Sequence, residues 1–293
     1  MAREKYRFNT PGGKVFDVFN VVLLSAIGIV ALIPFVYVIA GSFATELELA
    51  TRSFFVWPET FSLRAYESIL TSPTFLRAMV TTIGVTVVGT LLQLFLTASM
   101  AYPLSKSNLP ARRTLLSLIV FTMVFSGGMI PTFLVVKDLG LLDTYWALIL
   151  PLAINPFSLI IIKNFFEQLP GELEESAKID GANEMQALWS IILPLSKPVL
   201  ATFALFYAVG IWNDFMSPLL YLNDNSMWTL QMFLRQVTVA TDLSMLEADP
   251  SQMPPAQGIK FAVIVVATLP ILLFYPFLQK HFAKGMLIGS VKG

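Results

Sequence analysis

The sequence predicts an all-α integral membrane protein, and three observations lead to this fold class. The chain is 56% hydrophobic and only 13% charged, whereas about a quarter of the residues of a soluble globular protein are charged. Six apolar windows come close to the roughly 20 residues that a helix needs to cross the hydrocarbon core of a bilayer. Lys and Arg gather in every second segment between these windows, which is typical of a chain that crosses a membrane repeatedly.

The six predicted spans follow one another with little charge inside them. They are Val18 to Ala40, Met79 to Ala101, Leu115 to Val136, Tyr145 to Ile162, Pro198 to Tyr221 and Gly258 to Leu278. Only the last two contain a charged residue, Asp214 and Lys260, towards the outer end. The first span follows basic residues, as a signal peptide does, but its apolar stretch is longer than the about 7 to 15 residues of a signal sequence. We therefore expect it to be a membrane helix.

The orientation follows from the basic residues, because those that flank a span stay on the cytoplasmic side. Thirteen of the 19 lie in one alternating set: Arg3, Lys5, Arg7, Lys14, Lys106, Arg112, Arg113, Lys163, Lys178, Lys197, Lys280, Lys284 and Lys292. We therefore expect both termini and residues 163–197 to be cytoplasmic. Residues 222–257 should form an extracytoplasmic loop.

Residues 163–197 differ from the other inner segments, which are short and basic. Pro170 suits the first turn of a helix, and Glu172 and Glu174 are favourable near the positive end of a helix dipole. Gly181 follows as a break at the C-terminal end of that helix. The segment should therefore begin with a short helix that ends before Gly181.

A second short helix is expected from about Ala182 to Ile192, ended by Leu193-Pro194. Across both helices the loop reads Glu175-Ser176-Ala177, three residues, Gly181, nine residues, and then Ile191-Ile192-Leu193-Pro194. This pattern resembles the E-A-A loop of the inner-membrane permeases of ABC importers, specifically the carbohydrate-uptake group. Ser176 in place of Ala is the one departure from the spacing and residue types of that loop.

The resemblance implies that the whole chain, residues 1–293, is one permease domain of the bacterial inner membrane. In that family the loop is a coupling helix seated in a groove of a separate ATPase. The corresponding ATPase-coupling residues here are Glu174, Glu175, Ser176, Ala177, Asp180, Gly181, Ala182, Leu193 and Pro194.

The same resemblance implies the partners of the chain. They are a second, related permease subunit, two ATP-binding subunits that hold ATP and Mg²⁺, an extracytoplasmic solute-binding protein, and membrane lipid. The implied substrate is an oligosaccharide, in detail nearest to alginate or pectin-derived fragments. This chain itself is expected to bind no cofactor.

Several function classes lack the residues they need. The chain has no cysteine and one histidine, so we expect no metal site, and no constellation of residues predicts catalysis. Gly12-Gly13-Lys14 lacks the rest of a phosphate-binding loop, so ATP should bind elsewhere. Basic and acidic residues are equal at 19 each, which gives no reason to expect a nucleic-acid partner.

Polar and glycine residues at membrane depth are candidates for a substrate pathway, because lipid-facing polar groups are costly. The candidates are Ser126, Gly127, Gly128, Asn155, Tyr207, Trp212 and Asn213. The alternative is that such residues hold helices together.

Two rival functions remain. An ion-coupled secondary transporter predicts paired carboxylates near the midplane, whereas the spans contain only the peripheral Asp214. A membrane-embedded glycosyltransferase predicts Asp, His or Arg clustered at one interface, but the spacing of the loop motif already accounts for the acidic cluster from Glu172 to Asp180.

Overall fold

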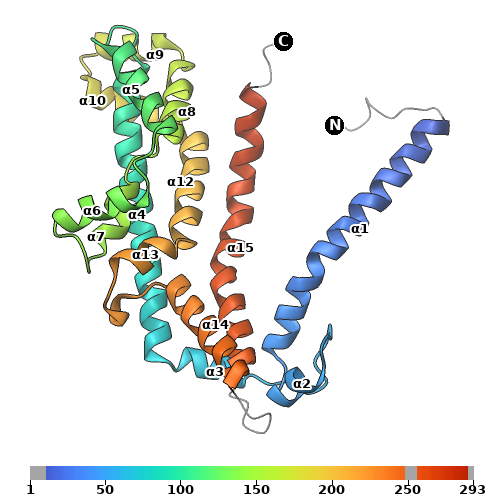
Figure 1. Ribbon diagram of the computed structural model, residues 1–293. Coiled ribbons are helices and arrows are strands. Elements are labelled where there is room, and N and C mark those ends of the chain that lie inside the picture. Colours follow the sequence, from blue (N-terminus) through green and yellow to red (C-terminus); the bar gives the residue numbers. More distant parts are fainter. Residues whose placement is uncertain (1–10, 248–255, 290–293) are drawn as a thin grey trace. The chain divides into compact units, whose positions relative to one another are not determined.

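The computed structural model describes residues 11–247 and 256–289 (Figure 1). Every regular element in these residues is a helix, so the predicted all-α fold class is confirmed. The chain divides into two compact units, Met1–Thr71 with Val237–Val266 and Ser72–Gln236 with Ala267–Gly293. The division passes through two helices, α14 (Leu230–Glu247) and α15 (Ala256–Gly289).

Some sequence predictions fall outside the described residues. These are both chain ends and, within the predicted outer loop, residues 248–255. The rest of that loop contains a short 3₁₀ helix, Asn225–Met227, and α14.

The first unit is dominated by α1 (Pro11–Ser42), which is apolar all round. The 31 residues Gly12–Ser42 qualify as a membrane span, and none of their most apolar stretch is buried within the protein. A helix with such a surface belongs in lipid or against another apolar helix. Two short helices follow, α2 (Glu46–Thr51) and α3 (Arg64–Leu70), and a small core forms around Leu49, Phe55 and Phe261.

The second unit is built around α4 (Pro73–Ser105). Ser72 caps its first turn, and Pro73 occupies a position where its missing N–H costs nothing. The helix packs along its length against α8 (Pro156–Glu167) and α12 (Lys197–Trp212). Ala98 and Ala101 in the core allow these helices to approach closely.

Three of the predicted spans are not single helices. The third splits into α5 (Arg112–Val124) and α6 (Met129–Asp138), bent by 113°. Gly128, with φ of +85°, lies at this break, in a conformation that glycine adopts without strain.

The fourth predicted span splits as well. It consists of α7 (Trp146–Ile149) with a 3₁₀ turn (Leu150–Leu152), and then α8 at 53° to them. Pro156 starts α8 and cannot donate the hydrogen bond that would continue the preceding helix. The fifth ends as α12 at Trp212 and resumes as α13 (Met216–Tyr221).

Within the described residues, two helices are long and apolar enough to cross a membrane, or up to five if each bent pair is one span. The apolar part of α15, Gln257–Leu273, is shorter. Membrane helices are confirmed, and the count of six stays a prediction.

Residues 163–197 contain α9 (Gly171–Ile179), α10 (Glu184–Ala187), a π-helical turn (Leu188–Ile192) and α11 (Leu193–Leu195). The prediction that Leu193-Pro194 ends the second helix is wrong. Pro194 lies in the first turn of α11, where no N–H is required. The chain changes direction at the buried Ser196. The axis of α12, which follows, is bent by 82° from that of Glu184–Leu195.

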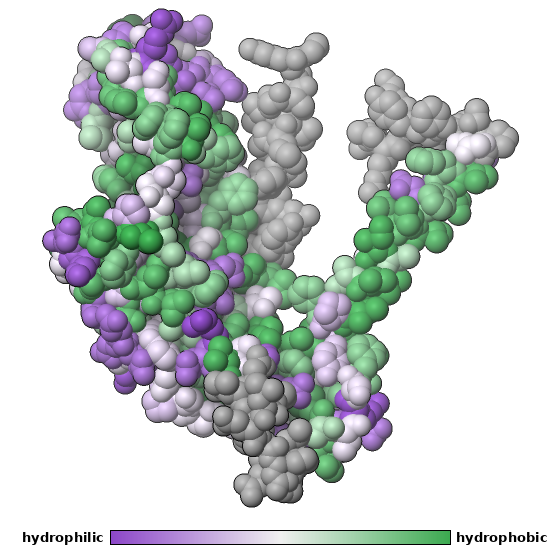
Figure 2. Space-filling model, viewed as in Figure 1, coloured by the Kyte–Doolittle hydropathy of each residue, from purple (hydrophilic) through white to green (hydrophobic). Residues whose placement is uncertain are grey.

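Hydropathy separates two regions of the second unit (Figure 2). Hydrophilic residues gather over α9 and α10, whereas hydrophobic residues cover much of the surface over α5 to α7. Phe121, Val124 and Ile130 are exposed there. The middle of the unit therefore has the surface of a membrane protein, and the α9–α10 end has that of an aqueous one.

Candidate functional site

The turn between α9 and α10 has a defined structure. The N–H of Ala182 donates to the carbonyl of Ala177 at 2.9 Å, and that of Gly181 donates to Lys178 at 3.1 Å. These two bonds form a Schellman motif, which requires a left-handed residue after the helix. Gly181 has φ of +86°. The predicted break is therefore confirmed, and its cause is the backbone conformation that Gly181 adopts.

The start of α10 is fixed by a capping box. The Asn183 side chain accepts from the N–H of Gln186 at 2.9 Å, and the Gln186 side chain accepts from the N–H of Asn183 at 2.8 Å. Sequence reasoning missed this pair, although a capping residue followed three positions later by Gln is a readable signal. Only Ala182 separates the Schellman glycine from this cap, so the two short helices are held at a defined angle.

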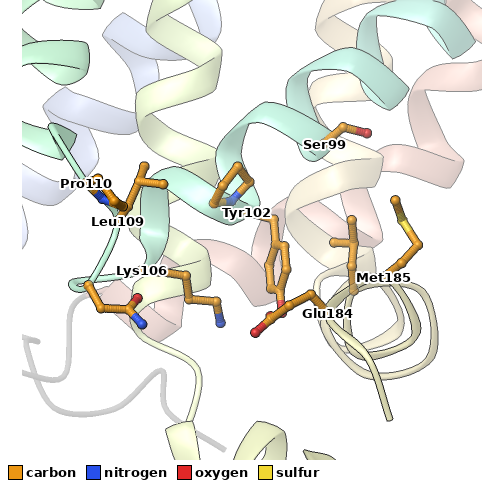
Figure 3. Close-up of a pocket in the computed structure, with 10 residues that line it drawn as sticks. Ser99, Tyr102, Lys106, Leu109, Pro110, Glu184 and Met185 are labelled. Atoms are coloured by element: carbon orange, nitrogen blue, oxygen red, sulfur yellow. The ribbon is translucent and has the colours of Figure 1, made fainter.

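Polar contacts attach both short helices to the last turn of α4 and the residue after it. Lys106 forms an ion pair with Glu174 of α9. The Tyr102 hydroxyl donates to Glu184 of α10 at 2.7 Å, and the Lys106 ammonium lies 4.4 Å from the centre of the Tyr102 ring. Figure 3 shows Tyr102 reaching towards Glu184, with Lys106 beside it.

A more exposed ion pair joins the two short helices to each other. Lys178 lies 2.6 Å from Glu184, and the hydrogen bond to this carboxylate raises the pKa of Lys178. Glu184 thus accepts from both α4 and α9. Sequence reasoning singled out Glu174 and missed Glu184, whose partner Tyr102 is remote in the chain.

Another pair of contacts holds the segment that leads into the loop. Glu167 at the end of α8 is paired with Lys163, at 2.7 Å, and with Arg112 at the start of α5. Arg112 also donates to the carbonyl of Leu104 at 2.8 Å. Groups from α4, α5 and α8 therefore meet at the same end of the unit as the loop, the α4 group being the main-chain carbonyl of Leu104.

A cavity of about 400 Å³ opens beside the buried contacts (Figure 3). Its lining comes from the end of α4, the following connection and α10: Ser99, Tyr102, Pro103, Lys106, Asn108, Leu109, Pro110, Glu184, Met185 and Leu188. The polar groups of Tyr102, Lys106 and Glu184 on its wall already have partners in the chain.

The nine predicted coupling residues differ in exposure. Glu175, Ser176, Asp180, Gly181 and Pro194 are exposed, Ala177, Ala182 and Leu193 are half-buried, and Glu174 is buried. Five large apolar side chains are also exposed on the loop, and sequence reasoning missed them: Leu173, Ile179, Met185, Trp189 and Leu195. Ile179, at 86% exposure, is directly beside the Gly181 turn. An apolar surface of this kind on a hydrophilic loop is typical of a docking site.

The predicted pathway residues fall into two groups. Ser126, Gly127 and Gly128 are exposed at the break between α5 and α6. The others have partners inside the chain: Asn155 caps α8, Tyr207 contacts Thr97 at 3.2 Å, Trp212 donates to Ala267 at 3.0 Å, and Asn213 donates to Val209 at 2.9 Å. Their contact with a substrate stays a prediction.

One face of α4 carries a line of buried polar residues that sequence reasoning did not identify. It contains Thr82, Thr86, Gln93 and Thr97, whose spacing by four or seven places them on the same side of a helix. Thr82 accepts from the N–H of Leu230 at 2.7 Å. This spacing is readable in the sequence, but nothing in it shows which helix the face meets.

The opposite end of the unit is held by Asp143. Its carboxylate accepts from the main-chain N–H of Asn223 at 2.5 Å and from the side-chain amide at 3.1 Å. These bonds lower the pKa of Asp143. Asp214 accepts from the N–H groups of Met216 and Ser217, at 3.0 and 3.1 Å, and so stabilises the start of α13.

A second, smaller cavity of about 190 Å³ lies at the first turns of α4. It is lined by Thr74, Arg77, Ala78, Asn225, Ser226 and Trp228. Its side chains include a cation, an aromatic ring and several hydroxyl or amide groups.

Among the described residues, no three His, Asp or Glu side chains lie close enough to hold a metal ion. A set of membrane helices with a folded, partly apolar loop at one hydrophilic end defines the class of membrane transport subunits. The model of the family described as "Binding-protein-dependent transport system inner membrane component" matches residues 1–288, and the chain belongs to this family. The predicted identity as an ABC-importer permease is confirmed.

Two relatives from Bacillus subtilis strain 168 match nearly the whole chain. Protein LplC is 65% identical over 295 residues and covers 100% of both chains. The polygalacturonan/rhamnogalacturonan transport system permease protein YtcP is 53% identical over 285 residues, which are 96% of this chain and 99% of YtcP.

Solved structures agree on the fold. A chain from the crystal structure of a bacterial ABC transporter involved in the import of the acidic polysaccharide alginate matches with a TM-score of 0.87 and 32% identity, over 94% of this chain and 99% of that one. A chain from the alginate transporter in complex with an alginate pentasaccharide-bound periplasmic protein matches with a TM-score of 0.56 at 14% identity, which shows similarity of fold alone.

Proposed function

We propose that the α9–α10 loop docks on a separate ATPase and that ATP hydrolysis there drives an oligosaccharide through the permease. The observation that carries this proposal is the loop itself. Its Schellman turn at Gly181, its capping box at Asn183 and its exposed apolar residues, Ile179 among them, form a rigid, partly apolar surface. A rigid surface loses little conformational entropy on docking.

The proposed complex contains this chain, a second related permease subunit, two ATP-binding subunits holding ATP and Mg²⁺, and an extracytoplasmic solute-binding protein. In this arrangement residues 163–197 and both termini are cytoplasmic, and residues 222–257 are extracytoplasmic. The charge of the inner segments supports the orientation, because thirteen of the 19 basic residues lie in them.

We further propose that the substrate is an acidic oligosaccharide of the pectin or alginate type. The names of YtcP and of the alginate transporter support this class. The cavity at the start of α4 supports it as well, because Arg77 could pair with a uronate carboxylate and Trp228 could stack on a sugar ring. With about 1.5 Å of rise per residue, the stretch of α4 from Arg77 to Tyr102 puts this cavity about 40 Å from the coupling loop, on the outer side.

The experiment is reconstitution of the permease pair with its ATPase and binding protein in lipid vesicles. ATP hydrolysis should rise when binding protein loaded with uronate oligosaccharides is added, and the labelled sugar should accumulate inside the vesicles. Neutral oligosaccharides of equal length serve as the control. Hydrolysis that does not respond to any loaded binding protein would refute the proposed function, and a preference for neutral sugars would refute only the substrate class.

A further inference from the structure

We infer that Tyr102, Lys106, Glu174 and Glu184 form a polar latch that makes the coupling loop and the cytoplasmic end of α4 move as one body. The inference rests on the proposed function, because it concerns the helix to which the loop transmits the movement of the ATPase. In the sequence the loop is continuous only with α8 and α12. The latch adds α4, the helix at the centre of the unit.

Two contacts attach the coupling loop to the end of α4, one on each side of the Gly181 turn. Glu174 comes from α9, before the Gly181 turn, and pairs with Lys106, 68 residues away in the chain. Glu184 comes from α10, after the turn, and accepts from Tyr102, 82 residues away. One contact would leave the loop free to pivot, whereas a contact on each side of the turn fixes its orientation on α4.

Burial distinguishes the Lys106–Glu174 half of the latch from an ordinary surface pair. The side chains of Lys106 and Glu174 are 26% and 12% exposed, whereas those of the Lys178 and Glu184 pair are 46% and 61% exposed. Separating a buried pair leaves charges that water does not reach well, so it costs more than separating an exposed pair. The Lys106–Glu174 contact should therefore remain closed while the loop moves, and the more exposed Glu184 adds its hydrogen bond from Tyr102 on the other side of the turn.

The position of α4 gives the latch its effect. Since α4 packs against both α8 and α12, a displacement of its cytoplasmic end repacks the core of the unit. Close-packed interiors transmit such displacements because they have little free volume. A push on the loop thus acts on three helices together.

The test uses the reconstituted complex and compares the amount of sugar transported per ATP hydrolysed. Lys106→Gln and Glu174→Gln should each lower this ratio about tenfold while the ATPase still binds and hydrolyses ATP, because the broken attachment lets the loop move without α4. The conservative variant Lys106→Arg, which keeps the positive charge beside Glu174 and over the Tyr102 ring, should retain most of the ratio. Arg113→Gln, the same charge change at an exposed position nearby, is the matched control.

Failure of this inference is distinguishable from failure of the proposed function. If the wild-type complex neither binds the ATPase nor couples hydrolysis to uptake, the proposed function is wrong. If the wild type couples and Lys106→Gln transports as much sugar per ATP, the latch is wrong. A Lys106→Arg variant that performs no better than Lys106→Gln also overturns it.

A distance measurement provides a second test. The chain has no cysteine, so spin labels can be placed at Asn108 after α4 and at Glu172 on α9, both of which are exposed. The distance between them should be the same in the ATP-free and ATP-bound complex of the wild type, and should change with ATP in Lys106→Gln. A change in the wild type would refute the movement as one body.

Discussion

Replacing Gly181 by alanine should weaken the binding of the ATPase subunit about tenfold. Gly181 has φ of +86°, and a residue with a Cβ in the left-handed region costs roughly 1–2 kcal/mol. If the loop must keep its Schellman turn to dock, the free energy of ATPase binding becomes less favourable by this amount. At 1.4 kcal/mol for each factor of ten, the loss corresponds to about 5- to 30-fold.

The open space around Gly181 allows the backbone strain of a substitution to be separated from a clash with the docked ATPase. A Cβ at this position would meet nothing within 4 Å. Gly181→Ala and Gly181→Leu should therefore destabilise the turn of the undocked loop by the same free energy. Gly181→Asn should cost less, because Asn enters the left-handed region more easily. Any further loss in the leucine variant therefore measures a clash with the docked ATPase.

The assay is the dissociation constant of the ATPase for the purified permease in lipid nanodiscs. Gly171→Ala is the matched control, because Gly171 starts α9 outside the left-handed region and a Cβ there also meets nothing within 4 Å. The alanine variant at 171 should bind as the wild type does. Wild-type affinity in Gly181→Ala would refute the requirement for this turn.

Three further predictions concern other parts of the chain. Ile179→Asp should lower ATPase affinity more than tenfold, because burying such a side chain contributes about 1.5–3 kcal/mol; the melting temperature should not change, since the residue is 86% exposed. Arg77→Gln should reduce uptake of uronate oligosaccharides and spare neutral ones, with Arg64→Gln as control; equal loss for both sugars would contradict the cavity assignment. Asp143→Asn should lower the melting temperature at pH 7, because the folded pKa of Asp143 is below its unfolded value of about 3.9. This stabilisation by Asn223 is fully present above the unfolded pKa and is lost as the pH falls through the folded pKa, so the difference between the two proteins should begin to shrink below about pH 4 and disappear only below the folded pKa; a difference that stays constant on acidification through this range would contradict it.

The membrane class and the loop could be predicted from the sequence because both depend on local patterns. Apolar windows identify membrane helices without knowledge of their neighbours, although they missed the bends at Gly128 and Pro156. Motif spacing located the loop, and glycine at position 181 indicated its break, since few other residues fit a left-handed turn.

The site required the tertiary structure wherever a residue acts through a partner that is remote in the chain. The acidic pattern of the loop predicts the same coupling role for Glu174 and Glu175. In the structure Glu174 is buried against Lys106, whereas Glu175 is exposed. The sequence did not indicate a role for Glu184, which is evident only from its contacts with Tyr102 and Lys178 in the structure.

By itself, the sequence determined that this chain is a helical membrane permease with a structured loop between its fourth and fifth predicted spans. Only the tertiary structure decided which side chains fasten that loop to α4 and which remain on its surface. The physical reason is the separation along the chain between the residues that interact. Helix formation, caps and turns depend on residues within a few positions of one another, whereas the contacts of Tyr102 and Lys106 close loops of 82 and 68 residues, for which neighbouring residues provide no signal.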